Sequence, residues 1–93
     1  MSASHCLVET TNPSRLITRL CKHWGHKFPV RHDEQEGDIQ LGIGQCRLRA
    51  TEGDLSVALE AEDAEQLQRL QQVVADHLER MASGETLVFN WQQ

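Results

Sequence analysis

Hydrophobic and polar positions alternate through the middle of the chain, from residue 28 to residue 61. Alternation puts successive side chains on opposite faces of a strand, so this region predicts several strands separated by turns. The predicted strands are 28–33, 39–43, 46–51 and 55–61, and the predicted turns are 34–38 and 52–54. Because one face of each strand is apolar and the other polar, the pattern is typical of an antiparallel sheet that is covered on one side only.

Two other segments follow the helical period of 3.6 residues. Asn12 and Pro13 suit the N-cap and first position of a helix that ends at Gly25, which is expected to take the left-handed conformation. Asp63, with Gln66 three residues later, is expected to cap a second helix, which Gly84 ends. The apolar faces of these helices are Leu16, Ile17, Leu20, Cys21 and Trp24 in the first, and Leu67, Leu70, Val74, His77, Leu78 and Met81 in the second.

Short segments at 4–10 and 86–91 are predicted to be the first and last strands, which gives the order β-α-β-β-β-β-α-β. Strands grouped between two helices predict an α+β fold, a two-layer sandwich in which both helices cover one face of an antiparallel sheet. With 93 residues, the chain is expected to form a single domain, 1–93, with one packed core and no deep cleft between domains.

The composition is that of a globular protein, with 39% hydrophobic and 25% charged residues. A net charge of −5 disfavours nucleic acid as a partner, because the phosphate backbone repels an acidic protein. No apolar segment is long enough to span a membrane, and the N-terminus shows no signal peptide. Three cysteines without a paired spacing fit reduced thiols. We therefore expect a cytoplasmic protein that binds neither nucleic acid nor membranes.

The net charge hides an uneven distribution. Residues 10–32 contain five basic side chains and no acidic one, and the acidic residues lie mostly after this segment. Such asymmetry is typical of a surface that binds an anion or a partner protein, although a solvated helix face has the same pattern. The residues that would form this basic surface are Arg15, Arg19, Lys22 and Lys27.

The stretch C-K-H-W-G-H-K at 21–27 brings a thiol and two imidazoles close together in the sequence. With His77 of the second helix, it offers ligands suited to a transition metal such as iron or zinc, and the predicted metal ligands are His23, His26 and His77. The alternative is structural: His77 would be a hydrogen-bonded core residue, His23 a helix-end residue and Cys21 a small buried hydrophobe. The pattern does not decide whether His23 and His77 lie close together.

The sequence points to no catalytic residue. Cys21 and His23 lie two positions apart on a helix, so their side chains point in different directions and do not form a nucleophile pair. No nucleophile elbow is present, and the glycines at 42 and 44 lie between strands rather than at the start of a helix.

Two segments carry a family resemblance, L-C-K-H-W-G-H-K at 20–27 and V-V-A-D-H-L-E-R-M at 73–81. Together with G-D-I-Q-L, L-R-A-T-E-G-D-L and A-E-D-A between them, they resemble an uncharacterised bacterial family known as domain of unknown function 2218. The likeness covers nearly the whole chain, with Trp24 and Met81 where phenylalanine is expected. The family has no established activity. Similar domains occur beside siderophore-interacting, ferric-reductase-like proteins, so the resemblance implies an iron-related context, with His23, His26 and His77 at the motif positions.

Three hypotheses follow. We favour a non-enzymatic accessory protein, linked to iron or siderophore metabolism, that engages an anionic small molecule or a siderophore-interacting or reductase-like protein through the histidines and the basic surface. The second is a small metal-dependent enzyme with His23, His26 and His77 as metal ligands. The third is a homodimeric structural protein, in which the basic first helix of one subunit faces the acidic turns of the other.

Overall fold

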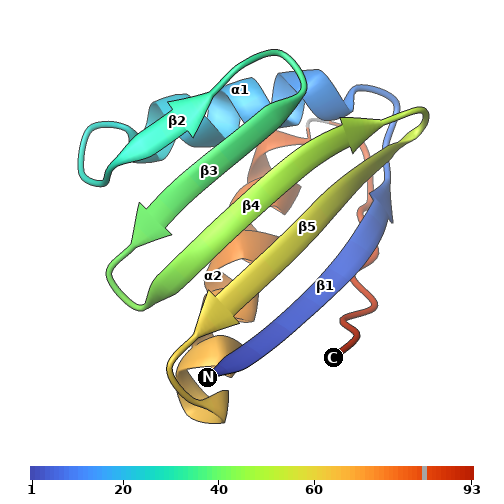
Figure 1. The fold of residues 1–93 in the computed structure, drawn as a ribbon. Helices are drawn as coiled ribbons and strands as arrows, with labels where there is room; N and C mark the ends of the chain where they lie inside the picture. Colours follow the sequence, from blue (N-terminus) through green and yellow to red (C-terminus); the bar gives the residue numbers. More distant parts are fainter. Residues whose placement is uncertain (83) are drawn as a thin grey trace.

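The computed structural model describes residues 1–82 and 84–93 and shows a five-stranded antiparallel sheet with two helices on one face (Figure 1). The elements are β1 (Ser2–Glu9), α1 (Pro13–Trp24), β2 (Val30–His32), β3 (Glu36–Leu41), β4 (Gly44–Thr51), β5 (Asp54–Ala61) and α2 (Ala64–Met81). The strands lie in the order β1-β5-β4-β3-β2, and every neighbouring pair is antiparallel. The predicted α+β fold and order of elements are confirmed.

The sheet has one apolar and one open face, as the alternation predicts. On β4 and β5 the side chains that point toward the helices are buried, including Cys46, Leu48, Val57 and Leu59. Together with the apolar faces of α1 and α2 they form the hydrophobic core, whose burial is the main stabilising contribution to a domain of this size. The opposite face of the sheet carries mostly charged, polar and small side chains, with Leu7 of β1 as an exposed hydrophobic residue.

Both helices begin where the capping residues predict. The Asn12 side chain accepts a hydrogen bond from the Arg15 amide at 3.3 Å, and Asp63 accepts one from the Gln66 amide at 2.8 Å. α1 ends at Gly25 as predicted, but Gly25 does not use the left-handed conformation open to it: its φ is −62°, and its amide donates to the Cys21 carbonyl in a right-handed turn. Gly84 does have the left-handed conformation, with φ +83°.

The predicted turn at 34–38 is wrong at its C-terminal end, because Gly37 is buried within β3. The turn lies earlier, where the Asp33 side chain accepts hydrogen bonds from the amides of Gln35 and Glu36, both at 2.8 Å. A Cβ atom at Gly37 would lie 2.8 Å from the Cys21 sulfur and 3.0 Å from Ile17. Glycine therefore allows α1 to pack directly against the backbone of β3.

Ile43 also differs from the prediction, because β3 ends at Leu41 and β4 starts at Gly44. Leu41 pairs with Gly44, so Gly42 and Ile43 form a two-residue hairpin loop rather than the end of a strand. Ile43 is half-buried and packs against the edge of the core. The loop places it near the end of α1, which matters for the site described below.

The last predicted strand, 86–91, is not a strand of the sheet: an isolated bridge just after it is the backbone pairing that joins this end of the described chain to β1. The segment is extended and follows β1, and an isolated antiparallel bridge joins His5 to Gln92 through two backbone hydrogen bonds of 2.8 Å (Figure 1). Leu87 is buried, while Phe89 and Trp91 are half-buried against the core. No helix within residues 1–82 and 84–93 is long and apolar enough to cross a lipid bilayer.

Candidate functional site

The end of α1 meets the C-terminal half of α2, and this contact brings three aromatic rings together. The His23 and His77 ring centroids are 5.1 Å apart, and those of Trp24 and His77 are 4.7 Å apart. His23 and Trp24 are neighbours on α1, with centroids 6.2 Å apart. We call these three residues the His–Trp cluster. The two histidine segments that are most distinctive in the sequence therefore form one surface.

His77 has a defined orientation within the cluster. Its Nδ1 atom lies 2.7 Å from the Val73 carbonyl oxygen, one turn earlier on α2. Since a carbonyl oxygen can only accept, Nδ1 must carry the proton and donate it. In the neutral ring the lone pair is then on Nε2. His77 is thus a hydrogen-bonded, half-buried residue, as predicted by the structural alternative. Its second ring nitrogen, Nε2, can still accept a hydrogen bond or bind a metal ion.

A surface hollow of about 520 Å³ opens beside the cluster. We call it the His–Trp hollow. Its walls come from four parts of the chain, namely α1, the turn that follows it, the β3–β4 loop and α2. The lining residues outside the cluster are His26, Lys27, Phe28, Leu41, Gly42, Ile43 and Val73. None of these lining residues, all of them among the residues that the structure describes, is acidic, although the whole chain has a net charge of −5.

The predicted metal ligands share this hollow. His23, His26 and His77 all line it, whereas Cys21 faces the sheet and is only 1% exposed. Within the described ranges, 1–82 and 84–93, no three His, Cys, Asp or Glu side chains are grouped in a way that could hold a metal ion. The three-histidine metal site thus stays a prediction, while the structure places His23 and His77 closest to each other.

All three cysteines lie in the core. Burial raises the pKa of the Cys6 thiol to about 11, and burial together with the charge of Asp38 raises the pKa of Cys21 to about 11 as well. Burial raises the pKa of Cys46 further in the same direction. Because the thiolate is the reactive form, these cysteines are protonated and inert at neutral pH.

The predicted basic surface is divided among three environments. Arg15 and Lys22 are exposed along α1, and Lys27 lines the His–Trp hollow. Arg19 instead donates a 2.7 Å hydrogen bond from its guanidinium to the Met81 carbonyl at the end of α2. A cation at this position satisfies a carbonyl that the helix leaves without a partner. The anion-binding role of this surface is still a prediction, and Arg19 has a structural role that the sequence did not indicate.

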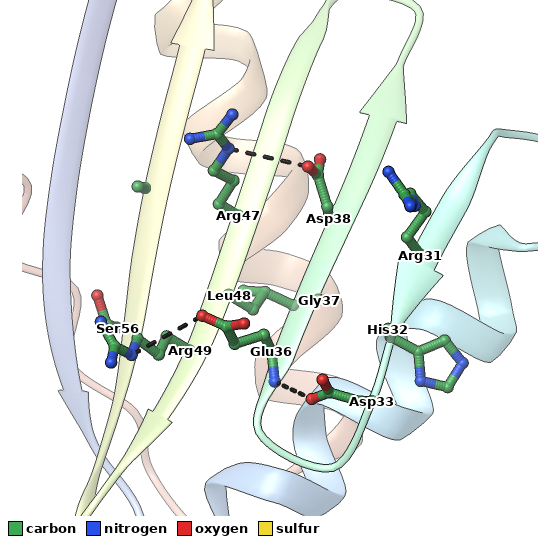
Figure 2. A pocket seen from close by; sticks show the side chains of 11 residues that line it. Arg31, His32, Asp33, Glu36, Gly37, Asp38, Arg47, Leu48, Arg49 and Ser56 are labelled. Carbon is green, nitrogen blue, oxygen red and sulfur yellow. Dashed lines mark hydrogen bonds and ion pairs between the residues drawn. The ribbon is translucent and has the colours of Figure 1, made fainter.

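A second hollow, of about 640 Å³, lies on the open face of the sheet (Figure 2). We call it the open-face hollow. Asp38 lies between Arg31 and Arg47, and the Arg47–Asp38 ion pair measures 3.8 Å. Arg49 and Glu36 form a second pair at 4.0 Å. Small side chains at Ser56 and Ala58 of β5 leave this space open. The alternating arginines of β4 were visible in the sequence, but their acidic neighbours on β3 become apparent only with the strand register.

Sequence reasoning also missed the apolar walls of the His–Trp hollow. Phe28 was assigned to a strand and Ile43 to the core face of another. The i, i+4 spacing of Val73 and His77 was a usable signal, because it allows a helical side chain to bond the preceding turn.

Comparison with known proteins gives a consistent result. The sequence matches the family described as "Uncharacterized protein conserved in bacteria (DUF2218)" over residues 5–92. Among solved structures, the chain is similar to the NMR structure of PA4090 from Pseudomonas aeruginosa, with 42% sequence identity and a TM-score of 0.83. That similarity covers 99% of this chain and 96% of the other. No curated protein matches the sequence. With nearly its whole length matched, the chain belongs to the DUF2218 family of uncharacterised bacterial proteins.

Proposed function

We propose that this protein is a non-enzymatic binding module that holds a small aromatic anion or an anionic metal chelate in the His–Trp hollow. The observation that carries the proposal is the lining of that hollow. It combines aromatic rings, imidazoles and one lysine, and no described residue in it is acidic. In a chain with a net charge of −5, such a lining is a local exception that favours an anion.

Each part of the lining has a role in this proposal. The rings of Phe28 and His23 offer faces against which a planar ligand can pack, and aromatic pairs gain about 0.5–1.5 kcal/mol beyond simple burial; Trp24 also lines the hollow but is only 5% exposed. Lys27 supplies a cation for a carboxylate or catecholate oxygen, an interaction stronger than a neutral hydrogen bond. Ile43 and Val73 supply apolar wall. This division into a mostly apolar lining and a few polar groups is typical of small-molecule sites.

The iron context narrows the ligand class. The family resemblance implies a position near siderophore-interacting, ferric-reductase-like proteins. The catechol rings of catecholate siderophores are planar and aromatic, and their deprotonated oxygens are anionic, so one such ring matches the lining on all three counts. We therefore propose a catecholate or its iron complex as the ligand, and a siderophore-interacting protein as the partner that exchanges it.

Fluorescence titration tests this proposal directly. A Trp91→Phe background leaves Trp24 as the only indole, because the chain contains two tryptophans. The probes are 2,3-dihydroxybenzoate and its ferric complex. We expect saturable quenching of Trp24 emission, because the ligand would lie beside the small exposed part of that ring.

The matched control separates the hollow from the rest of the basic surface. Lys27→Glu should weaken binding at least tenfold, whereas Arg15→Glu makes the same charge change at the exposed start of α1 and should leave the affinity within twofold. Equal losses in both variants, or the absence of saturable quenching, would overturn the proposal.

A further inference from the structure

We propose that His23 and His77 together bind one divalent transition-metal ion at the wall of the His–Trp hollow. The inference rests on the proposed function, because the ion would lie where the anionic ligand enters and would coordinate it. The proposal concerns two imidazoles on different helices, one near the end of α1 and one in the C-terminal half of α2.

The first argument is the spacing of the rings. Imidazole nitrogens bind zinc at about 2.0–2.1 Å, so two rings on one tetrahedral ion have their centroids roughly 5 Å apart. The His23 and His77 centroids are 5.1 Å apart, with their planes inclined at 52°. The helices thus hold the two ring centroids at a separation that is compatible with a shared ion.

The second argument is the hydrogen bond of His77. Metal-binding histidines almost always donate their other ring N–H to a carboxylate, carbonyl or water, which fixes the ring and raises its basicity. The Nδ1–H of His77 donates to the Val73 carbonyl at 2.7 Å, so Nε2 is the free ligand atom. Trp24 packs on the same ring, with centroids 4.7 Å apart, and restricts its rotation. The His77 side chain has therefore already lost, in the folded protein, part of the conformational entropy that it would lose on binding an ion.

The third argument concerns the open positions. Among the residues that the structure describes, no third His, Cys, Asp or Glu is grouped with these two as a ready ligand. A tetrahedral ion on His23 and His77 would therefore have two positions left for other ligands, which the proposed anion would fill from the hollow that His26 also lines. Catecholates and carboxylates bind through oxygen, so the ion would join the ligand to the protein.

The donor atoms also predict a metal preference. Imidazole suits copper, nickel, zinc and iron, while magnesium and calcium prefer oxygen ligands. We expect affinity to follow Cu²⁺ > Ni²⁺ and Cu²⁺ > Zn²⁺, with no binding of Mg²⁺. Binding should weaken in acid, because a proton and the ion compete for the same imidazole lone pair.

The test is a titration of the untagged chain with Zn²⁺ alone. Calorimetry measures the affinity and stoichiometry, and ¹⁵N NMR of the imidazole nitrogens identifies the ligands. We expect one ion per chain and a selective shift of His77 Nε2 and of one His23 nitrogen. His23→Ala and His77→Phe should each weaken binding at least tenfold; the phenylalanine keeps a ring against Trp24, so that the variant stays folded. His5→Ala removes an exposed histidine of β1 and should have no effect.

Other results would overturn the inference. These are unchanged affinity in both His23→Ala and His77→Phe, a loss in His5→Ala equal to theirs, or no binding of Zn²⁺ and Cu²⁺. If the metals fail to bind while 2,3-dihydroxybenzoate still quenches Trp24, the metal site is wrong and the proposed function stands. If the metals bind and the organic anion does not, with or without the ion, the proposed function is wrong and the metal site stands.

Discussion

The two hollows of this protein differ in what their polar groups are already doing. The open-face hollow is larger and more highly charged, but Arg47 and Arg49 each pair with a carboxylate of the neighbouring strand. In the His–Trp hollow, only one nitrogen of His77 is occupied, and Lys27 has no ion pair within residues 1–82 and 84–93. A ligand on the open face would meet two weak, water-screened ion pairs and the guanidinium of Arg31, whereas one beside α2 would meet Nε2 of His77 and the Lys27 ammonium. Under the proposed function, the absence of acidic side chains from the described lining of the His–Trp hollow, rather than the volume of the hollow, is what favours an anion there.

The two hollows also differ in how they are built. The open-face hollow is a product of strand register, since each of its ion pairs joins a residue of β4 to its partner on β3. The His–Trp hollow depends on how α1 and α2 pack on the sheet, because its histidines come from separate helices. Changes to helix packing should therefore affect the His–Trp hollow and leave the charge pairs in place.

The largest expected effect is at Gly37, which lies under α1 on one side and lines the open-face hollow on the other. Gly37→Val would force side-chain atoms into Ile17 and Cys21, and we expect it to lower the free energy of unfolding by about 3 kcal/mol, the upper part of the usual range for overpacking. Urea denaturation measures this change. Gly42→Ala is the control, because a Cβ there meets no atom within 4 Å. Equal stability of the two variants would contradict tight packing of α1 on β3.

The next effect is a loss of stability in alkali that comes from the thiols between the two hollows. An unfolded thiol has a pKa near 9.0, whereas the pKa values of Cys6 and Cys21 in the folded protein are raised to about 11. Between these values the unfolded chain loses protons that the folded chain retains, so stability falls as the pH rises.

We expect the free energy of unfolding to fall by at least about 2.5 kcal/mol between pH 8 and pH 10, on the order of 1 kcal/mol for each of these two thiols, and Cys46 acts in the same direction. Urea denaturation at both pH values measures it, and Cys6→Ala should reduce the pH dependence even though it lowers stability at pH 8. A free energy that is constant over this interval would mean that the thiols are accessible to water.

Most of the fold was predictable because its signals are local. Asn12 and Asp63 bond amides three residues away, and the alternation at Cys46, Leu48, Val57 and Leu59 reflects the geometry of a single strand. The predictions are wrong where contacts between elements, rather than the local sequence, determine the backbone structure. Gly37 resembles a turn residue in the sequence, but it is in β3 because α1 lies against it, and no local rule contains that information.

The candidate site was predictable in its residues but not in its arrangement. The histidine spacings identified His23, His26 and His77, yet the contact between His23 and His77 depends on the angle at which two helices meet. The position of Arg19 depends on the same packing, because its partner Met81 lies 62 residues away. Long-range contacts of this kind leave no periodic trace in one sequence.

The side chain of Arg19 connects α1, which carries His23, to the C-terminal end of α2, which carries His77. Arg19→Ala removes a charged hydrogen bond to a helix-terminal carbonyl and should lower the free energy of unfolding by about 1 kcal/mol. It should also raise amide exchange in the last turn of α2. Arg15→Ala, an exposed residue of the same helix, should change stability by less than about 0.5 kcal/mol. A similar loss in both would show that general charge, rather than this bond, stabilises the helix end.

The smallest expected effect is at the ion pairs of the open face. Arg47 and Asp38 are 65% and 35% exposed and lie 3.8 Å apart, and exposed pairs of this kind typically contribute about 0.2–1 kcal/mol. In a double-mutant cycle of Arg47→Ala and Asp38→Ala we expect a coupling energy below about 0.5 kcal/mol, toward the lower end of that range because water screens the long contact. Neither variant should alter quenching of Trp24 by 2,3-dihydroxybenzoate. A coupling well above this value would mean that the open-face charges form a rigid, preorganised surface. A loss of quenching would place the anion on the sheet instead of beside α2.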